Sequence, residues 1–387
     1  MTPRERMTAT LEHRKPDRVP MQVNARQEVE EALVAHYGVS NFREVLEVFD
    51  ADLWRSVGAK IRRASYTKRA DGEITGDFGA TGRVIVHDER TFEDLFGVVE
   101  RVGKDGKYLE WVDGPFTKTD DLDSFDWPTP EEIEAPTDMQ ERVKALQDEG
   151  YWVSGSGGRH PFKQSWHMRG FENFLCDYLA NPAFVEAIYG RVMALNIAAC
   201  RAAAEAGVDM IDYWGDVAMQ DRMILPPEQW RRLDKPVWAE IIRATREVKP
   251  DMVFFFHSDG DISPIVDDLL EVGFDIINPI QPECIDPARF KQRWGDRCTM
   301  FGGGSVQRTL PFGSVDDVRR EAEYLLTCCA YDGGYVLEAS NAISFDCPAE
   351  NVAAFFETGR DFDLSALAGP PDAIPDHPPC MDIAIEV

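Results

Sequence analysis

One stretch of the chain, residues 252–283, constrains the fold more than any other. It reads MVFFFHSDGDISPIVDDLLEVGFDIINPIQPE. The apolar run 252–256 is too short for a helix and rich in aromatic residues, which favours a buried strand. A helix follows, with Pro264 at its start and Gly273 just past its end. Residues 274–280 are a second predicted strand, and such a strand–helix–strand unit builds a parallel sheet.

The rest of the chain repeats this alternation of short strands and amphipathic helices. The chain contains about eight predicted strands, each near a helix, which predicts an α/β protein with a (β/α)8 TIM barrel. A doubly wound open sheet is the alternative, but the Gly-x-Gly-x-x-Gly motif of dinucleotide-binding folds follows none of these strands. The predicted strands are residues 17–23, 52–57, 151–155, 208–214, 252–256, 274–280, 298–304 and 334–339.

We expect a single barrel domain over residues 1–387 with one interruption. Residues 58–135 are rich in glycine and contain alternating stretches such as RVIVHDE and KYLEWVD. This pattern predicts a β-rich insertion of hairpins after the second strand of the barrel. The tail, residues 364–387, is rich in proline and is expected to wrap around the barrel or to fray.

The composition limits the partners of the protein. The 387 residues include 41 Lys and Arg against 69 Asp and Glu, a net charge of −28, which argues against nucleic acid and anionic membranes as partners. The N-terminal residues lack the apolar core of a signal peptide, and no apolar run approaches the roughly 20 residues of a membrane span. The 8 cysteines form no Cys-x-x-Cys pair, so we expect free thiols and a cytoplasmic protein.

Polar side chains cluster where the two central strands end. His257 and Asp259 follow the first of these strands, and Asn278, Gln281 and Glu283 lie in or just beyond the second. Chemistry in α/β folds is placed at this carboxyl edge of the sheet. His257 and Asp259 are two residues apart, so in an extended segment they face the same side. Nitrogen and oxygen ligands together suit zinc or another divalent metal.

Three interpretations of His257 and Asp259 stay open at this point. The first is a metal site in which Glu338 or Glu283 is a further ligand. The second is an acid–base pair or substrate contact without a metal. The third is structural: Asp259 caps the following helix, and His257 donates to a backbone carbonyl.

Further polar residues are expected at the same edge. Asp216 and Gln220 either bind a substrate hydroxyl or satisfy their own loop. His167 and Arg169 could bind a carboxylate, although Arg169 could equally bridge to an acidic helix. Tyr213 belongs to an aromatic group that either lines a pocket or packs in the core. The predicted catalytic residues are His257, Asp259 and Asp216, and the predicted substrate-binding residues are Gln220, Asn278, Gln281, His167, Arg169, Tyr213 and Asn341.

The chain resembles the uroporphyrinogen decarboxylase superfamily over most of residues 1–362. The resemblance is carried by the opening TPRERMTATLEHRKPDRVP and by three later segments: RGFENFLCDYLANPAFVEAIYGRV at 169–192, FFHSDGDISPIVDDLLEVGFDIINPIQ at 255–281 and GGYVLEASNAISFDCPAENVAAFF at 333–356. It implies a (β/α)8 barrel, in agreement with the strand count.

The resemblance also implies a class of activity. True decarboxylases of the superfamily carry an arginine-rich RQAGRY-like motif after the first strand, where this chain reads MQVNARQEVEE at 21–31. The other branch of the superfamily consists of methyltransferases that work with a corrinoid. Well-known members bind zinc through His-x-Cys after the fifth strand and a Cys after the eighth. Here His257 matches the histidine, Asp259 replaces the first cysteine, and Asn341 lies near the position of the second.

These departures imply a harder site of nitrogen and oxygen ligands, suited to a methyl group bound to oxygen. We therefore expect methyl transfer from a small, methoxylated aromatic donor to a corrinoid (cobalamin). His257 and Asp259, with Glu338 as a further metal ligand, would assist at the leaving oxygen. Asp216, Gln220 and Asn278 would position the donor. The chain lacks the Asp-x-His-x-x-Gly motif of cobalamin-binding proteins, so the corrinoid is expected on a separate partner protein or free.

Two rival functions are also considered. A cofactor-free decarboxylase or lyase for a small aromatic or carboxylic acid would place His167 and Arg169 opposite His257. A binding or sensor protein would hold its ligand without turnover. Assembly as a homodimer is compatible with each of these functions.

Overall fold

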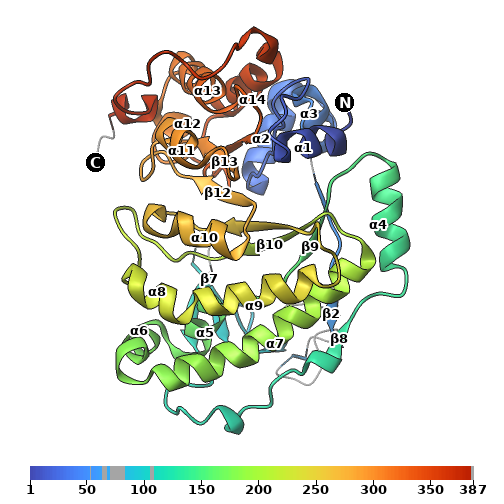
Figure 1. Cartoon of the computed structure of the whole chain (residues 1–387), viewed down its shortest axis with the longest axis vertical. Helices are drawn as coiled ribbons and strands as arrows, with labels where there is room; N and C mark the ends of the chain where they lie inside the picture. The colour runs from blue at the N-terminus through green and yellow to red at the C-terminus, as the bar shows by residue number, and fades with distance from the viewer. Residues whose placement is uncertain (53, 63–67, 70–82, 105–108, 385–387) are drawn as a thin grey trace.

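A computed structural model describes residues 1–52, 54–62, 68–69, 83–104 and 109–384. Its centre is a sheet of seven strands in the order β1–β9–β10–β11–β12–β13–β14, with helices packed around it (Figure 1). All neighbouring strands in this sheet are parallel, which confirms the predicted α/β class. The strands are β1 (Arg55–Ser56), β9 (Val153–Ser156), β10 (Met210–Trp214), β11 (Val253–His257), β12 (Ile276–Ile280), β13 (Thr299–Gly304) and β14 (Tyr335–Ala339).

The N-terminal segment around Met21 links the two edges of this sheet. Met21 forms a parallel bridge with Leu337 of β14, and N of Gln22 donates to O of Leu337 at 3.1 Å. On the other side, N of Asp52 donates to O of Met21 at 2.8 Å, just before β1. The predicted strand at 17–23 is thus reduced to one isolated bridge, at Met21. It nevertheless takes the place between β14 and β1 that makes the sheet TIM-barrel-like.

The helices follow the strands in sequence and cover the outside of the sheet, as crossover connections between parallel strands do. Contacts of α14 with α2 and α3 bring the two ends of the fold together (Figure 1). The helices besides α7 are α1 (Pro3–Leu11), α2 (Gln27–Tyr37), α3 (Phe42–Phe49), α4 (Met139–Asp148), α5 (Pro161–Arg169), α6 (Phe171–Ala180), α8 (Pro227–Leu233), α9 (Lys235–Arg246), α10 (Val266–Val272), α11 (Pro287–Trp294), α12 (Thr309–Phe312), α13 (Val315–Cys329) and α14 (Ala349–Asp361).

The helix α7 (Pro182–Ala206) is long and apolar enough to cross a membrane by length and composition alone. Half of its most apolar window is buried inside the protein, and Phe184, Ile188 and Leu195 are among its buried side chains. α7 contacts α5, α6 and α9. Its burial is that of a core helix, which passes the same test.

Strands outside the central sheet lie between β1 and β9. β2 (Lys60–Ile61) pairs antiparallel with β8 (Ile133–Glu134), and β3 to β7 form a second sheet. The pairs β4–β5, β5–β6 and β6–β7 are antiparallel, whereas β3–β4 is parallel. Within the predicted hairpin region 58–135, residues 63–67, 70–82 and 105–108 lie outside the described residues. The strands of the second sheet are β3 (Lys68–Arg69), β4 (Arg83–Val86), β5 (Thr91–Asp94), β6 (Val99–Val102) and β7 (Leu109–Asp113).

The C-terminal tail lies along the outside of the protein up to residue 384. Its 3-10 helix η7 (Pro379–Asp382) contacts α13, and the Cys380 side chain is fully buried. Nη1 of Arg308 also donates to O of Ile383 at 2.9 Å. The last predicted tail residues, 385–387, lie outside the described residues.

Inside the sheet, alternate strand residues form an apolar layer below a polar one. The rings of Phe255 in β11 and Phe301 in β13, two strands that are not neighbours, lie 5.7 Å apart. This apolar floor consists of Met7, Trp152, Met210, Phe255, Ile276, Phe301 and Val336. Side chains two positions further along a strand share the same side. These are Asp212, His257, Asn278 and Glu338, which places a polar layer toward the carboxyl edge.

Candidate functional site

Three side chains with metal-binding groups converge at this carboxyl edge. Asp216, His257 and Asp259 each offer an atom, and these atoms lie within 4.8 Å of one another. Nε2 of His257 lies 3.8 Å from Oδ1 of Asp216 and 3.9 Å from Oδ1 of Asp259. The strand pairing explains this meeting, because Trp214 at the end of β10 is the register partner of His257 at the end of β11. Such separations suit one cation about 2.0–2.2 Å from each ligand atom.

His257 is held from behind by hydrogen bonds inside the sheet. Its Nδ1 lies 2.6 Å from Oδ1 of Asn278, and Nδ2 of Asn278 donates to Oε2 of Glu338 at 2.9 Å. The Trp214 ring packs on the imidazole with the two centroids 4.6 Å apart. Burial lowers the pKa of His257 below its usual value, so the imidazole is neutral near pH 7, as a metal ligand must be.

The predicted metal ligand Glu338 has a different position. Its carboxyl group is buried in the polar layer and accepts from Asn278, while the converging group among the described residues contains Asp216 instead. Glu338 lies within β14, whereas Asp216 lies two residues beyond the end of β10. Asp216 therefore reaches the rim and Glu338 stays below it. Asn278, predicted to contact substrate, is only 2 % exposed and lies behind the imidazole.

The charge balance of Asp259 favours a cation. Its Oδ2 accepts from Nδ2 of Asn341, but its Oδ1 is buried and accepts no hydrogen bond from the described residues. Burial and the negative charge of Asp216 raise the pKa of Asp259 to about 7. An unpaired buried acceptor beside a second carboxylate is costly. A divalent cation would give the unpaired oxygen a partner and would offset the repulsion between the two carboxylates. One neutral nitrogen and two carboxylates therefore fit zinc or a similar metal.

Amide side chains form a connected group beside these ligands. Oε1 of Gln281 accepts from N of Gly260 at 2.9 Å, and Nε2 of Gln281 donates to Oε1 of Gln220 at 3.4 Å. Nε2 of Gln220 donates in turn to Oε1 of Gln307 at 3.3 Å. The structure thus brings together Gln220 and Gln281, two of the predicted substrate-binding residues, and a third, Asn341, lies with Gln281 beside Asp259.

A pocket of about 280 Å³ opens next to Asp259. This volume is near the lower end of the range of roughly 300–1,000 Å³ for small-molecule sites. Most of the lining side chains are polar, and they come from the loops after several strands of the sheet. The lining consists of Arg26, Asp259, Gln281, Val306, Gln307, Ser340, Asn341, Ala342 and Ser344.

Three predicted substrate-binding residues do not join this site. The Arg169 guanidinium binds Asp177 of α6, with Nε donating to Oδ2 at 2.7 Å, which bears out the alternative of a bridge to an acidic helix. Tyr213 is buried and donates to O of Gly157 at 2.7 Å, so it belongs to the core. The His167 ring packs on Trp166, with centroids 3.9 Å apart, and burial lowers its pKa to about 3.

We expect Arg169→Ala to destabilise the protein without changing its zinc affinity. Arg169 is 15 % exposed and Asp177 is 9 % exposed, and Nη1 of Arg169 also donates to O of Phe116 at 2.7 Å. Removing one partner of such a pair costs about 3 kcal/mol. Urea unfolding measures the loss, and calorimetric zinc titration measures affinity. A stable variant with weakened zinc binding would instead place Arg169 in the site.

One residue that lines the pocket, Arg26, was not predicted, because it lies in a loop where no periodicity marks it. Another unpredicted residue lies beneath the site. Asp212 shares the inner side of β10 with Met210, so strict strand alternation could have identified it. Oδ2 of Asp212 accepts from Nε1 of Trp214, the residue whose ring packs on His257.

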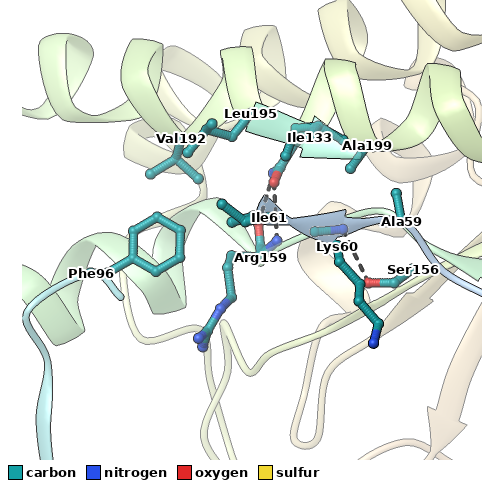
Figure 2. Close-up of a pocket in the computed structure, with 12 residues that line it drawn as sticks. Ala59, Lys60, Ile61, Phe96, Ile133, Ser156, Arg159, Val192, Leu195 and Ala199 are labelled. Carbon is teal, nitrogen blue, oxygen red and sulfur yellow. Dashed lines mark hydrogen bonds between the residues drawn. The ribbon is translucent and has the colours of Figure 1, made fainter. Parts of the chain in front are cut away.

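A second pocket lies beside α7, and none of the predicted site residues lines it (Figure 2). Val192 and Leu195 of α7 lie along one side, where β8 with Ile133 contacts α7, and Ile61 of the paired strand β2 lies below them (Figure 2). Nη2 of Arg159 donates to Oδ2 of Asp94 at 2.9 Å. The full lining is Ala59, Lys60, Ile61, Phe96, Ile133, Ser156, Gly158, Arg159, Val192, Leu195, Asn196 and Ala199.

Comparison with known families shows which family the chain belongs to. The sequence pattern of the family "Uroporphyrinogen decarboxylase (URO-D)" matches residues 91–362, which is more than half of the chain. This α/β protein with a polar carboxyl edge therefore belongs to the uroporphyrinogen decarboxylase family, as the resemblance predicted.

Curated relatives match over part of their length. The chain is 26% identical over 140 residues to a uroporphyrinogen decarboxylase of Crocosphaera subtropica, covering 36% of this chain and 38% of that protein. For the enzyme of Synechocystis the identity is 22% over 186 residues, covering 48% of this chain and 50% of that protein. The chain thus spans between about a third and a half of the curated relatives it matches.

A solved structure is similar over nearly the whole chain. It is a methyltransferase from Methanosarcina mazei, with a TM-score of 0.62 and 18% identity, and the match covers 94% of this chain and 99% of that one. At this identity the similarity establishes the fold.

Proposed function

We propose that this protein is a methyltransferase that moves a methyl group from the oxygen of a small donor to a corrinoid. A divalent metal, zinc in the first instance, would be held by Asp216, His257 and Asp259. The observation that carries the proposal is the convergence of these three ligands within 4.8 Å at the carboxyl edge of the sheet. The whole-chain similarity to a methyltransferase supports the choice of reaction.

The three ligands would hold a cation next to the leaving oxygen, where it would stabilise the negative charge that develops. Demethylation leaves an alkoxide or phenoxide, and a Lewis acid at that oxygen lowers the barrier by several kcal/mol. His257 provides a neutral nitrogen, since burial lowers its pKa. Asp259 provides an oxygen that no other described group engages. N of Asp259 donates to Oδ1 of Asp216 at 3.0 Å, which fixes the two carboxyl groups relative to one another.

The pocket beside Asp259 is the proposed position of the donor. Gln281, Gln307 and Asn341 line it and offer amide groups to the polar substituents of a donor. Trp214 lies against His257 and is 38 % exposed, so its ring offers a stacking surface for an aromatic group. A small methoxylated aromatic molecule matches this combination of a polar pocket and one exposed aromatic face.

The corrinoid would supply the cobalt nucleophile that accepts the methyl group. Exposed apolar side chains that could contact a macrocycle occur at or beyond the carboxyl ends of β10 and β14: Trp214 is 38 % exposed, Met219 42 % and Phe345 54 %. Because the chain lacks a cobalamin-binding His motif, we place the corrinoid on a separate protein or free in solution. A cytoplasmic location and a homodimer stay predictions.

The contacts of Arg169 argue against the rival decarboxylase or lyase function. It required His167 and Arg169 to face His257 across a pocket. Arg169 instead pairs with Asp177 and donates to the backbone oxygens of Phe116 and Thr119. A group committed to three acceptors is not available to hold a substrate carboxylate.

Formation of methylcobalamin tests the proposal. Zinc-loaded protein is mixed with cob(I)alamin and a panel of methoxylated aromatics and simple methyl donors, and the absorption spectrum is followed. We expect methylcobalamin with at least one donor, and no formation in the Asp216→Ala variant. Absence of methylcobalamin across the panel, with zinc bound to the protein, would contradict the assigned reaction. Release of CO₂ from a carboxylic acid in its place would favour the lyase.

A further inference from the structure

Two buried side chains behind His257 are linked across a strand. Glu338 lies in β14 and Asn278 in β12, with β13 between them. They meet inside the sheet, where Nδ2 of Asn278 donates to Oε2 of Glu338 at 2.9 Å. Glu338 is 4 % exposed and Asn278 is 2 % exposed. Neither side chain belongs to the group of converging metal ligands.

The hydrogen-bond chain from Glu338 to His257 has a direction. An ionised carboxylate only accepts hydrogen bonds, so Asn278 must offer its NH₂ group to Glu338. Its carbonyl oxygen Oδ1 then faces Nδ1 of His257, 2.6 Å away. A nitrogen bonded to a carbonyl oxygen must carry the hydrogen. With Glu338 ionised, His257 is therefore protonated at Nδ1, and the lone pair of Nε2 points toward Asp216 and Asp259.

We propose that Glu338 is a positioning residue that fixes the tautomer of His257 through Asn278. This inference rests on the proposed metal site, because the Nε2 lone pair matters as a ligand for a cation. Metal-binding histidines commonly donate their second N–H to a carboxylate or carbonyl, which fixes the ring and its tautomer. Here the side-chain amide of Asn278 lies between His257 and Glu338. Glu338 sets the orientation of this amide, and that orientation determines which nitrogen of His257 carries the hydrogen.

The cost of Glu338 supports a functional reason for its presence. A carboxyl group among the buried residues of β14 is expensive to ionise, and burial raises the pKa of Glu338 to about 8. Only the ionised form enforces the direction of the chain. A protonated carboxyl could instead donate to a turned Asn278, whose NH₂ group would then face His257. A bound cation in front of His257 favours the ionised form of Glu338.

Variants that exchange amide and carboxyl groups at positions 338 and 278 distinguish control of the His257 tautomer from a purely packing role of Glu338. Glu338→Gln can donate to Oδ1 of a turned Asn278, which would put the hydrogen of His257 on Nε2. The double variant Glu338→Gln with Asn278→Asp restores the direction: the new amide donates to the new carboxylate, which accepts from Nδ1 of His257. Glu321→Gln is the matched control. Glu321 is also buried, with a pKa raised to about 7, but it accepts from Ser305 and Thr309.

The experiment reads the tautomer directly, by two-bond ¹H–¹⁵N NMR of histidine-labelled, metal-free protein at pH 9, where Glu338 is ionised. The His257 signals are assigned from their loss in His257→Gln. We expect Nδ1–H in the wild type, in Glu321→Gln and in the double variant, and Nε2–H or a mixture in Glu338→Gln. Zinc affinity should fall roughly 10–100-fold in Glu338→Gln and recover in the double variant.

Two results would overturn the inference. One is Nδ1–H and wild-type zinc affinity in Glu338→Gln. The other is a folded double variant that keeps the wrong tautomer, and this result decides the matter even if the single variant fails to fold. Neither readout requires methyl transfer. If the tautomer follows Glu338 but no methylcobalamin forms, the proposed reaction fails while the positioning role stands.

Discussion

The His257→Ala variant is expected to bind no zinc at the carboxyl edge and to form methylcobalamin about 1,000-fold more slowly than the wild type. The imidazole is the nitrogen ligand of the proposed site, with Nε2 3.8 Å from Asp216 and 3.9 Å from Asp259. Without it, two carboxylates must hold the cation alone. Losing a Lewis acid worth several kcal/mol corresponds to about three powers of ten in rate.

Zinc content by mass spectrometry and the initial rate of methylcobalamin formation measure this effect. The control is His36→Ala, since His36 is an exposed residue of α2, and that variant should match the wild type. Zinc retained by His257→Ala at one equivalent would refute the ligand assignment. Loss of zinc with an unchanged rate of methylcobalamin formation would show that the reaction does not need the metal.

The second large effect concerns the closure of the sheet, where Asp52→Ala should destabilise the protein by about 3–5 kcal/mol. Asp52 accepts from Nη1 of Arg6 and Nη1 of Arg18, and N of Met21 donates to its Oδ2 at 3.2 Å. Its side chain is 1% exposed, and those of Arg6 and Arg18 are 5% and 10% exposed. The substitution leaves buried guanidinium groups without their shared partner.

Urea unfolding followed by circular dichroism gives this free energy. Asp50→Ala is the control, because Asp50 also binds Arg18, at 2.7 Å, but its side chain is 65% exposed. A surface pair of this kind contributes at most about 1 kcal/mol. Equal losses in the two variants would show that the segment around Met21 does not depend on the buried charges.

The strand–helix–strand unit at 252–283 shows how far the sequence could predict the fold. Its strands β11 and β12 and the end of its helix α10 form where apolar runs and Gly273 indicated, because these signals are local. The start of the helix differs, because Pro264 lies in a 3-10 turn, Ser263–Ile265, and α10 begins at Val266. His257 and Asp259 are brought together for the same reason, since residues at i and i+2 of an extended segment share a side. Between β10 and β11 the chain forms two helices, α8 and α9, which are separated at Asp234, and Pro236 lies in the first turn of α9.

The ligand set could not be chosen from the sequence alone. Asp216, Glu338 and Glu283 all lie near strand ends, and which of them meets His257 depends on the height of each residue relative to the rim. Glu338 sits one layer too low, and Oε1 of Glu283 accepts from Oγ of Ser305 instead. The role of Arg169 was equally a matter of tertiary structure, since its partner Asp177 lies on the next helix.

The most direct test of the metal site is a crystal structure of the zinc-loaded protein with anomalous diffraction at the zinc edge. We predict one anomalous peak at the carboxyl edge, about 2.0–2.2 Å from Nε2 of His257 and from oxygens of Asp216 and Asp259. A peak bound by other residues, or none at this position in protein saturated with zinc, would contradict the account.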